Sequence, residues 1–165
     1  MKKNKIYAVG IGPGDIDLIP DKIKSILKEV DVVVGYTTYI KLVEDLIDGK
    51  EIIVNGMRGE VERCRMALDE VLNGKSVAVI SSGDPGIYAM AGLLYELTEE
   101  SVYRSIEVQV FPGITAANAA AAVLGAPLMN DFVTLSLSDL MTPNELIRKR
   151  IKLAAEADLV TVFYN

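Results

Sequence analysis

Histidine is absent from this sequence of 165 residues, and cysteine occurs once, as Cys64. Without histidine the chain has no Ser-His-Asp triad, no Cys-His dyad and no histidine-ligated metal site. A single cysteine supports neither a disulfide framework nor a thiolate zinc site. We therefore expect no metal held by the protein. We also expect Cys64, which falls on an apolar helical face, to be a small core residue.

Basic residues are outnumbered by acidic ones: 17 Lys and Arg stand against 23 Asp and Glu, a formal net charge of −6. Nucleic-acid binding needs clustered basic residues that neutralise phosphates, and the sequence has no basic run. No apolar run approaches the roughly 20 residues that span a membrane. The basic start is followed by an apolar piece too short for a signal peptide. We expect a cytoplasmic protein with no nucleic-acid or membrane partner.

Five short apolar runs, nearly continuous rather than alternating, recur along the first two thirds of the chain. They cover residues 6–11, 31–34, 51–54, 76–80 and 106–111. Such runs are typical of strands that are covered on both faces. Between them lie segments with helical spacing, for which the apolar faces are Ile19, Ile23, Ile26 and Leu27, and Val61, Cys64, Leu68 and Val71. This alternation predicts an α/β fold with an open, mostly parallel five-stranded sheet and helices on both faces.

A second rhythm begins near Gly125. It consists of a strand at 132–137, a helix that Thr142 caps and that runs to about Ala157, and a strand at 159–164. Two strands and one helix cannot bury both faces of their own sheet. We therefore predict an N-terminal α/β domain at 1–124 and the incomplete start of a second α/β domain at 125–165. The alternative is that these pieces join the first sheet.

Glycine-rich segments follow three of the predicted strands. Gly10–Asp15 follows the first strand, but Asp15 stands where a dinucleotide fingerprint needs its third glycine, and Pro13 removes an N–H. Ser81–Tyr88 and Pro112–Ala117 follow the fourth and fifth strands in the same way. Each segment alone is also explained by a tight turn or a helix start. Together they predict a crevice at the carboxyl ends of the strands, suited to a ligand with hydroxyls and a positive charge rather than phosphates.

These segments together resemble the tetrapyrrole (corrin/porphyrin) methylase family of S-adenosylmethionine-dependent methyltransferases. The resemblance covers the whole chain and rests on residues 10–15, 31–34, 82–85, 112–116 and 162–165. Within the family, residues 56–60, 81–88 and 135–143 are similar to the C17-methylating branch of cobalamin (vitamin B12) synthesis. That branch acts on precorrin-3B or cobalt-factor III, and its anaerobic form couples methylation to ring contraction.

The resemblance implies a two-domain enzyme, usually a homodimer, with S-adenosylmethionine as cofactor and S-adenosylhomocysteine as product. The cofactor-binding positions that it carries over are Pro13, Ser82, Gly83, Asp84, Ile87, Thr115, Ala116 and Asn165. A tetrapyrrole substrate carries many carboxylates, so we single out Arg58, between two glycines, to bind it. We also hypothesise that Tyr36 positions or protonates the macrocycle. Any cobalt would belong to the substrate.

Two departures from the family pattern matter. Tyr36 stands where the uroporphyrinogen-methylating branch has an aspartate, so the general base proposed for that branch is not carried over. Only the opening part of the family's second domain is present, which leaves open whether this chain is active alone. Other hypotheses are a methylase of a different ring carbon, a non-catalytic ligand-binding fragment and a Rossmann oxidoreductase. The last would need a glycine at position 15 and an acidic residue at the end of the second strand, where the chain has Gly35 and Tyr36.

Overall fold

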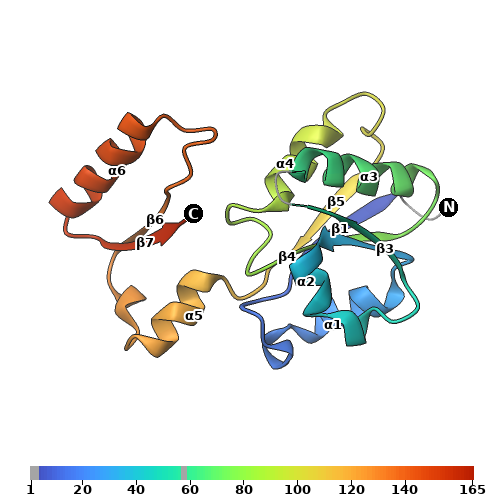
Figure 1. Cartoon of the computed structure of the whole chain (residues 1–165), viewed down its shortest axis with the longest axis horizontal. Coiled ribbons are helices and arrows are strands. Elements are labelled where there is room, and N and C mark those ends of the chain that lie inside the picture. The colour runs from blue at the N-terminus through green and yellow to red at the C-terminus, as the bar shows by residue number, and fades with distance from the viewer. Residues whose placement is uncertain (1–3, 57–58) are drawn as a thin grey trace. The chain divides into compact units, whose positions relative to one another are not determined.

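The computed structural model describes residues 4–56 and 59–165 (Figure 1). They form two compact units, Met1–Thr115 and Ala116–Asn165. The division therefore falls before the helix at 116–123, whereas the sequence predicted a domain boundary after it, between residues 124 and 125. The helix belongs with the second unit because the backbone N–H of Ala117 donates to the Tyr164 hydroxyl at 3.0 Å. That the second unit begins a domain of its own stays a prediction.

The first unit contains the predicted five-stranded sheet, and all its strands are parallel. The strands are β1 (Lys5–Gly10), β2 (Val32–Tyr36), β3 (Glu51–Asn55), β4 (Val77–Ser81) and β5 (Glu107–Phe111), in the spatial order β3-β2-β4-β1-β5. The central strands are buried on both faces: Val32, Val33 and Val34 of β2 have no exposed surface. This double burial explains why the strand sequences are continuously apolar rather than alternating.

Helices cover both faces of this sheet, and each face has its own core (Figure 1). α1 (Asp21–Glu29) buries Ile23, Ile26 and Leu27 on one face, where the short helix α2 (Thr37–Lys41) also lies. α3 (Glu60–Leu72) and α4 (Met90–Thr98) cover the other face. The 3₁₀ turns of the unit are η1 (Ile16–Leu18) and η2 (Glu44–Leu46). The predicted α/β arrangement is confirmed.

The inward face of α3 differs at its first turn from the prediction. Cys64, Leu68 and Val71 are buried as expected, but the side chain of Val61 is 49% exposed. Arg63 is buried in this turn instead, in helical register with the buried Ala67 and Val71. Helical spacing of apolar residues predicted that Val61 is buried, because the pattern considers apolar side chains alone and therefore omits Arg63.

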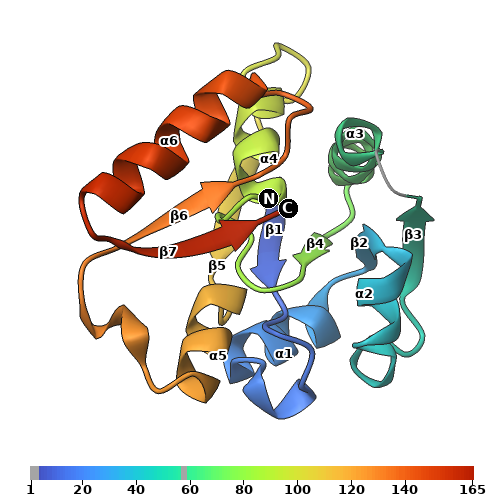
Figure 2. The same ribbon diagram turned by 60° about the vertical axis from the view of Figure 1, so that its left-hand side comes forward.

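The second unit contains α5 (Ala116–Val123), η3 (Pro127–Met129), β6 (Phe132–Ser136), α6 (Asn144–Glu156) and β7 (Val160–Tyr164). β6 and β7 are parallel neighbours in a sheet of their own, and α6 connects them (Figure 2). The alternative that these strands join the first sheet is therefore wrong. Leu135 of β6 and Ile147 and Ala154 of α6 are each buried.

The predicted cap of α6 is also wrong. Pro143, not Thr142, is the residue that precedes the helix, and its backbone is extended, with φ −56° and ψ 136°. The Pro143 carbonyl accepts the N–H groups of Leu146 and Ile147, at 2.9 and 3.2 Å. A proline at the first helical position and one just before it give the same sequence signal, which is why the spacing misplaced the start by a residue. Within residues 4–56 and 59–165, no helix has the length and apolar character needed to cross a membrane.

Candidate active site

β1 and β4 are neighbours whose following segments leave toward opposite faces of the sheet. The chain after β1 leads to α1 on one face, whereas the chain after β4 leads to α4 on the other. Divergence of two adjacent loops opens a crevice at the carboxyl ends of the strands, which is where open α/β sheets bind their ligands. β5 pairs with β1 on its other side, so its following loop borders the same edge.

The three glycine-rich loops meet there backbone to backbone. Gly12 and Gly83 exchange hydrogen bonds: the Gly12 N–H donates to the Gly83 carbonyl at 3.2 Å, and the Gly83 N–H donates to the Gly12 carbonyl at 2.8 Å. A Cβ on Gly10 would lie 2.7 Å from the backbone nitrogen of Gly113 and would also meet the Gly83 carbonyl oxygen. A Cβ on Gly113 would meet the carbonyl oxygens of Gly83 and Gly10. The loops after β1, β4 and β5 therefore form one cradle whose packing requires bare backbone.

Polar groups are found at the end of β4 and on the loop that follows it. The half-buried carboxylate of Asp84 accepts the Gly86 N–H at 2.7 Å through Oδ1, which leaves Oδ2 without a partner among the described residues. Ser81, the last residue of β4, is 3% exposed, and its hydroxyl is buried without a hydrogen-bond partner in the part of the chain that the structure describes. The sequence predicted no role for Ser81, although it is the first residue of the segment Ser81–Tyr88.

Most of the predicted cofactor-binding residues lie on this edge of the first unit. Pro13 is on the loop after β1, and Thr115 follows β5. The remaining ones in this unit, Ser82, Gly83, Asp84 and Ile87, are on the loop after β4. Ala116 and Asn165 belong to the second unit, so the first unit does not bring them to the cradle.

Tyr36 and Arg58 are the two residues predicted to act on the substrate. Tyr36 ends β2 at the same edge of the sheet and contacts Tyr39 edge-on, with 5.4 Å between ring centroids. Arg58 lies outside the described residues. Arg63 of α3 was not predicted, yet it is buried beside the segment that precedes Arg58 in the sequence. Its inward register with Ala67 and Val71 is the sequence signal that could have found it.

Cys64 is not part of the candidate site chemistry. It is buried in the core under α3, and this burial raises the pKa of its thiol to about 12. A thiol that stays protonated is a poor nucleophile. In the described residues, no cluster of Cys, Asp and Glu side chains could hold a metal ion.

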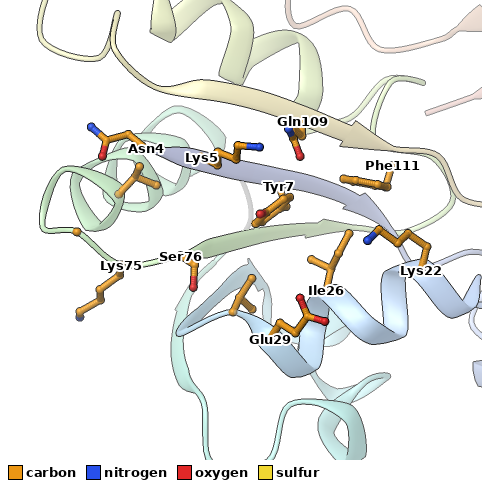
Figure 3. Close-up of a pocket in the computed structure, with 13 residues that line it drawn as sticks. Asn4, Lys5, Tyr7, Lys22, Ile26, Glu29, Lys75, Ser76, Gln109 and Phe111 are labelled. Atoms are coloured by element: carbon orange, nitrogen blue, oxygen red, sulfur yellow. The ribbon is translucent and has the colours of Figure 1, made fainter. Parts of the chain in front are cut away.

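A cavity of about 420 Å³ lies elsewhere in the first unit (Figure 3). Lys5 and Tyr7 of β1, Phe111 of β5 and Lys22 of α1 are among the residues that line it. None of the predicted site residues contributes to it. The candidate site is therefore the cradle at the carboxyl edge and not this cavity.

Known proteins resemble the whole chain. Residues 5–165 match the family model of the Tetrapyrrole (Corrin/Porphyrin) Methylases. A probable cobalt-factor III C(17)-methyltransferase of Salmonella typhimurium is 48% identical over 160 residues, which are 97% of this chain and 66% of that protein. The cobalt-factor III methyltransferase of Priestia megaterium is 46% identical over 99% of this chain and 31% of that protein.

A solved structure agrees with these relatives. The crystal structure of the methyltransferase CobJ matches with a TM-score of 0.92 and 38% identity, over 97% of this chain and 67% of that one. The chain thus spans about two thirds, or less, of the length of the relatives named here.

Proposed function

The chain belongs to the tetrapyrrole (corrin/porphyrin) methylase family, and from this premise we propose that its protein methylates a corrin precursor. The cofactor is S-adenosylmethionine, the substrate is cobalt-factor III or precorrin-3B, and the methyl acceptor is C17. The reaction belongs to cobalamin biosynthesis and is coupled to ring contraction. We extend the proposal to a cytoplasmic homodimer, as the family resemblance implies.

The observation that carries the proposal is the cradle of three loops in a chain with such relatives. Gly10, Gly83 and Gly113 meet without side chains at the switch point of the sheet. This arrangement gives a ligand access to backbone groups of three loops at once. Proteins 46% and 48% identical to this chain are named as cobalt-factor III methyltransferases, which supports the substrate, and the name of the second specifies C(17), which supports the ring position.

The residues of the cradle fit S-adenosylmethionine. The free Oδ2 of Asp84 can accept a ribose hydroxyl or an amino group, and the orphaned Ser81 hydroxyl can serve a further polar group. Pro13 interrupts the N–H groups that a pyrophosphate would need, and the Asp84 carboxylate repels phosphate, so the same residues disfavour a dinucleotide. The residues proposed to hold the cofactor are Pro13, Ser82, Gly83, Asp84, Ile87, Thr115, Ala116 and Asn165.

When bound, S-adenosylmethionine supplies an electrophilic methyl group on a sulfonium centre. Transfer of that group needs a nucleophilic carbon in line with it and little acid–base assistance, so positioning can supply most of the rate. A site without histidine suits this chemistry. Two backbone hydrogen bonds between Gly12 and Gly83 join the loops after β1 and β4 on the cofactor side of the cradle.

The substrate side needs positive charge, because the tetrapyrrole is polyanionic and the chain is acidic overall. We propose that Arg58 pairs with a substrate carboxylate and that Tyr36 orients the macrocycle. β2, which ends at Tyr36, and β3, which precedes Arg58 in the sequence, lie on the side of the sheet away from β5. Cofactor and substrate thus use different parts of one sheet edge.

Ligand titration tests the proposal. Calorimetry with S-adenosylhomocysteine, NAD and ATP should give binding for the first alone, and incubation with S-adenosylmethionine and cobalt-factor III should give a methylated product detected by mass spectrometry. NAD binding in place of S-adenosylhomocysteine would overturn the methyltransferase proposal in favour of a dinucleotide-binding protein. Binding of S-adenosylhomocysteine with methylation of a different carbon would keep the family and overturn the ring position.

A further inference from the structure

Tyr88, on the loop after β4, has a backbone conformation that tyrosine rarely adopts. Its φ is 51°, in the left-handed region that glycine enters without a steric cost. Among the described residues other than glycine, Ala126 and Asp158 are the only others with a positive φ. Ala126 has a small side chain, and aspartate tolerates this region because its short polar side chain can form local hydrogen bonds. Tyr88 is therefore the only bulky residue of the described part of the chain in this conformation.

Burial of the ring does not offset this strain. Tyr88 is 56% exposed, so packing of its side chain contributes less to stability than packing of a buried ring. A strained backbone of this kind persists where the surrounding structure holds it, and such residues cluster at active sites and ligand-binding loops. Glycine would adopt the same φ without the cost. The stability of the loop therefore does not explain why position 88 carries a tyrosine.

Hydrogen bonds hold the backbone on both sides of Tyr88. The Ile87 N–H donates to the Asp84 carbonyl at 3.3 Å and closes a turn just before it. The Ala91 N–H donates to the Pro85 carbonyl at 2.9 Å, and Tyr88 lies within the stretch of chain that this bond closes. These bonds fix the position of Tyr88 in the loop and the direction in which its side chain leaves the backbone.

The closed stretch is anchored on the cradle. A Cβ added to Gly10 would lie 2.8 Å from Pro85 Cδ, so the Pro85 ring packs against the bare backbone at the end of β1. Gly83, two residues before Pro85, exchanges two hydrogen bonds with Gly12 of the loop after β1. Because Pro85 also accepts the bond that closes the stretch around Tyr88, this residue is fixed relative to the cradle.

The other end of the segment Ser81–Tyr88 has a second local cost. The Ser81 hydroxyl is buried without a hydrogen-bond partner among the described residues. The hydroxyl of Ser76, just before the other end of β4, donates to the Asp31 carboxylate at 2.6 Å. An alanine at position 81 would avoid the cost of a buried hydroxyl that makes no hydrogen bond. Departures from the locally stable residue at both ends of one segment are typical of functional sites.

We infer that the ring of Tyr88 contacts the ligand bound in the cradle, an inference that rests on the S-adenosylmethionine site proposed above. A polar contact alone does not require tyrosine, because asparagine or aspartate supplies a polar group and tolerates a positive φ. What tyrosine adds is an aromatic ring, a large and rigid surface for stacking and apolar contact. S-adenosylmethionine offers such a surface in its adenine ring. The ligand is the cofactor because the stretch that carries Tyr88 is anchored on the cofactor cradle.

Calorimetric titration with S-adenosylhomocysteine and thermal unfolding of the protein that carries this chain test the inference together. Tyr88→Gly removes the ring and the strain, so the dissociation constant should rise about tenfold while Tm does not fall. Tyr88→Phe keeps the ring, and its dissociation constant should stay within about threefold of the wild-type value. A tyrosine retained only for stability would give the opposite result in Tyr88→Gly, a lower Tm with unchanged affinity.

Tyr95→Ala is the matched control, because Tyr95 of α4 is similarly exposed, at 51%, and lies outside the loop. Its affinity for S-adenosylhomocysteine should equal that of the wild type. If Tyr88→Gly does not fold, Tyr88→Asn also removes the ring, tolerates the positive φ and should show the same loss of affinity.

Two results overturn the inference and leave the proposed function standing. One is unchanged S-adenosylhomocysteine affinity in the variants without the ring, and the other is a loss in Tyr88→Phe as large as in Tyr88→Gly. A wild type that does not bind S-adenosylhomocysteine overturns the proposed function and the inference with it.

Discussion

Replacing Gly113 by alanine tests the cradle at its tightest point. Gly113 stands two residues after β5, and an added Cβ would lie 2.7 Å from the carbonyl carbon of Gly10 and closer still to two carbonyl oxygens. Carbon atoms in contact normally stand about 3.5–4.0 Å apart. The loop after β5 must therefore move by roughly 1 Å relative to the loop after β1. Its neighbours are backbone atoms of two other loops, so no flexible side chain can make room.

The magnitude follows from this displacement. Overpacking of a well-packed site typically costs about 1–3 kcal/mol, and we expect the Gly113→Ala variant to lose stability in this range. In a chain of this size that corresponds to a fall in Tm of several degrees. A shift of about 1 Å in a binding loop can cost about a hundredfold in function, so affinity for S-adenosylhomocysteine should fall at least tenfold.

Gly92→Ala is the control for this experiment. Gly92 lies inside α4, and a Cβ added there meets nothing within 4 Å. Alanine in place of glycine within a helix should stabilise the protein by about 0.5–1 kcal/mol, with S-adenosylhomocysteine affinity unchanged. Thermal unfolding and calorimetric titration of both variants make the comparison. Wild-type stability and affinity in Gly113→Ala would show that the three loops do not pack as described, and the site argument would fail.

Three further predictions concern individual side chains. Asp84→Ala should lower S-adenosylhomocysteine affinity at least tenfold with little change in Tm, because Asp84 lies in a loop and its carboxylate has a free oxygen; unchanged affinity in calorimetry would remove it from the site. The bond from Arg65 lowers the pKa of Glu100, so the stability contributed by this pair is present above the ordinary carboxyl pKa and is lost as pH falls through the lowered one. Glu100→Gln should therefore show a shallower loss of stability in acid than the wild type in urea unfolding, and parallel acid profiles would contradict this. Cys64 should resist alkylation at about pH 8 in the folded protein and react once denaturant unfolds it, since burial keeps its thiol protonated; rapid labelling of the native state would disprove the burial.

The sheet and the position of the candidate site could be predicted from the sequence because both depend on local signals. A run such as Val32–Val34 must be covered on both faces, and this requirement alone favours a central parallel strand. Glycines directly after such strands mark the carboxyl edge, and carboxyl ends of parallel strands share one edge whatever the order of the strands. That Gly10 and Gly113 contact the backbone of other loops could not be predicted, because the strand order is a tertiary property.

Arg63 shows what the sequence pattern of one helix could not predict. Helical periodicity assigns inward positions to apolar residues, so it selected Val61 and passed over a cation that is in register with Ala67 and Val71. A buried arginine needs hydrogen-bond acceptors for its N–H groups. Here the acceptors are the Asn55 amide oxygen and the Gly56 carbonyl, which lie at and just after the end of β3 and not on α3. The pattern of one segment carries no information about acceptors supplied by another.

The two sides of the edge are held by different means, and this difference bears on function. The loops after β1, β4 and β5 are fixed by backbone contacts between glycines, which tolerate no side-chain change and suit a ligand that all members of a family share. Gly56 and Gly59, which follow β3, are bonded by side chains instead: the Gly56 carbonyl accepts from Arg63 and the Gly59 carbonyl accepts from the Asn55 amide. A family that keeps one cofactor and varies its tetrapyrrole would be expected to place specificity on the side that side chains control.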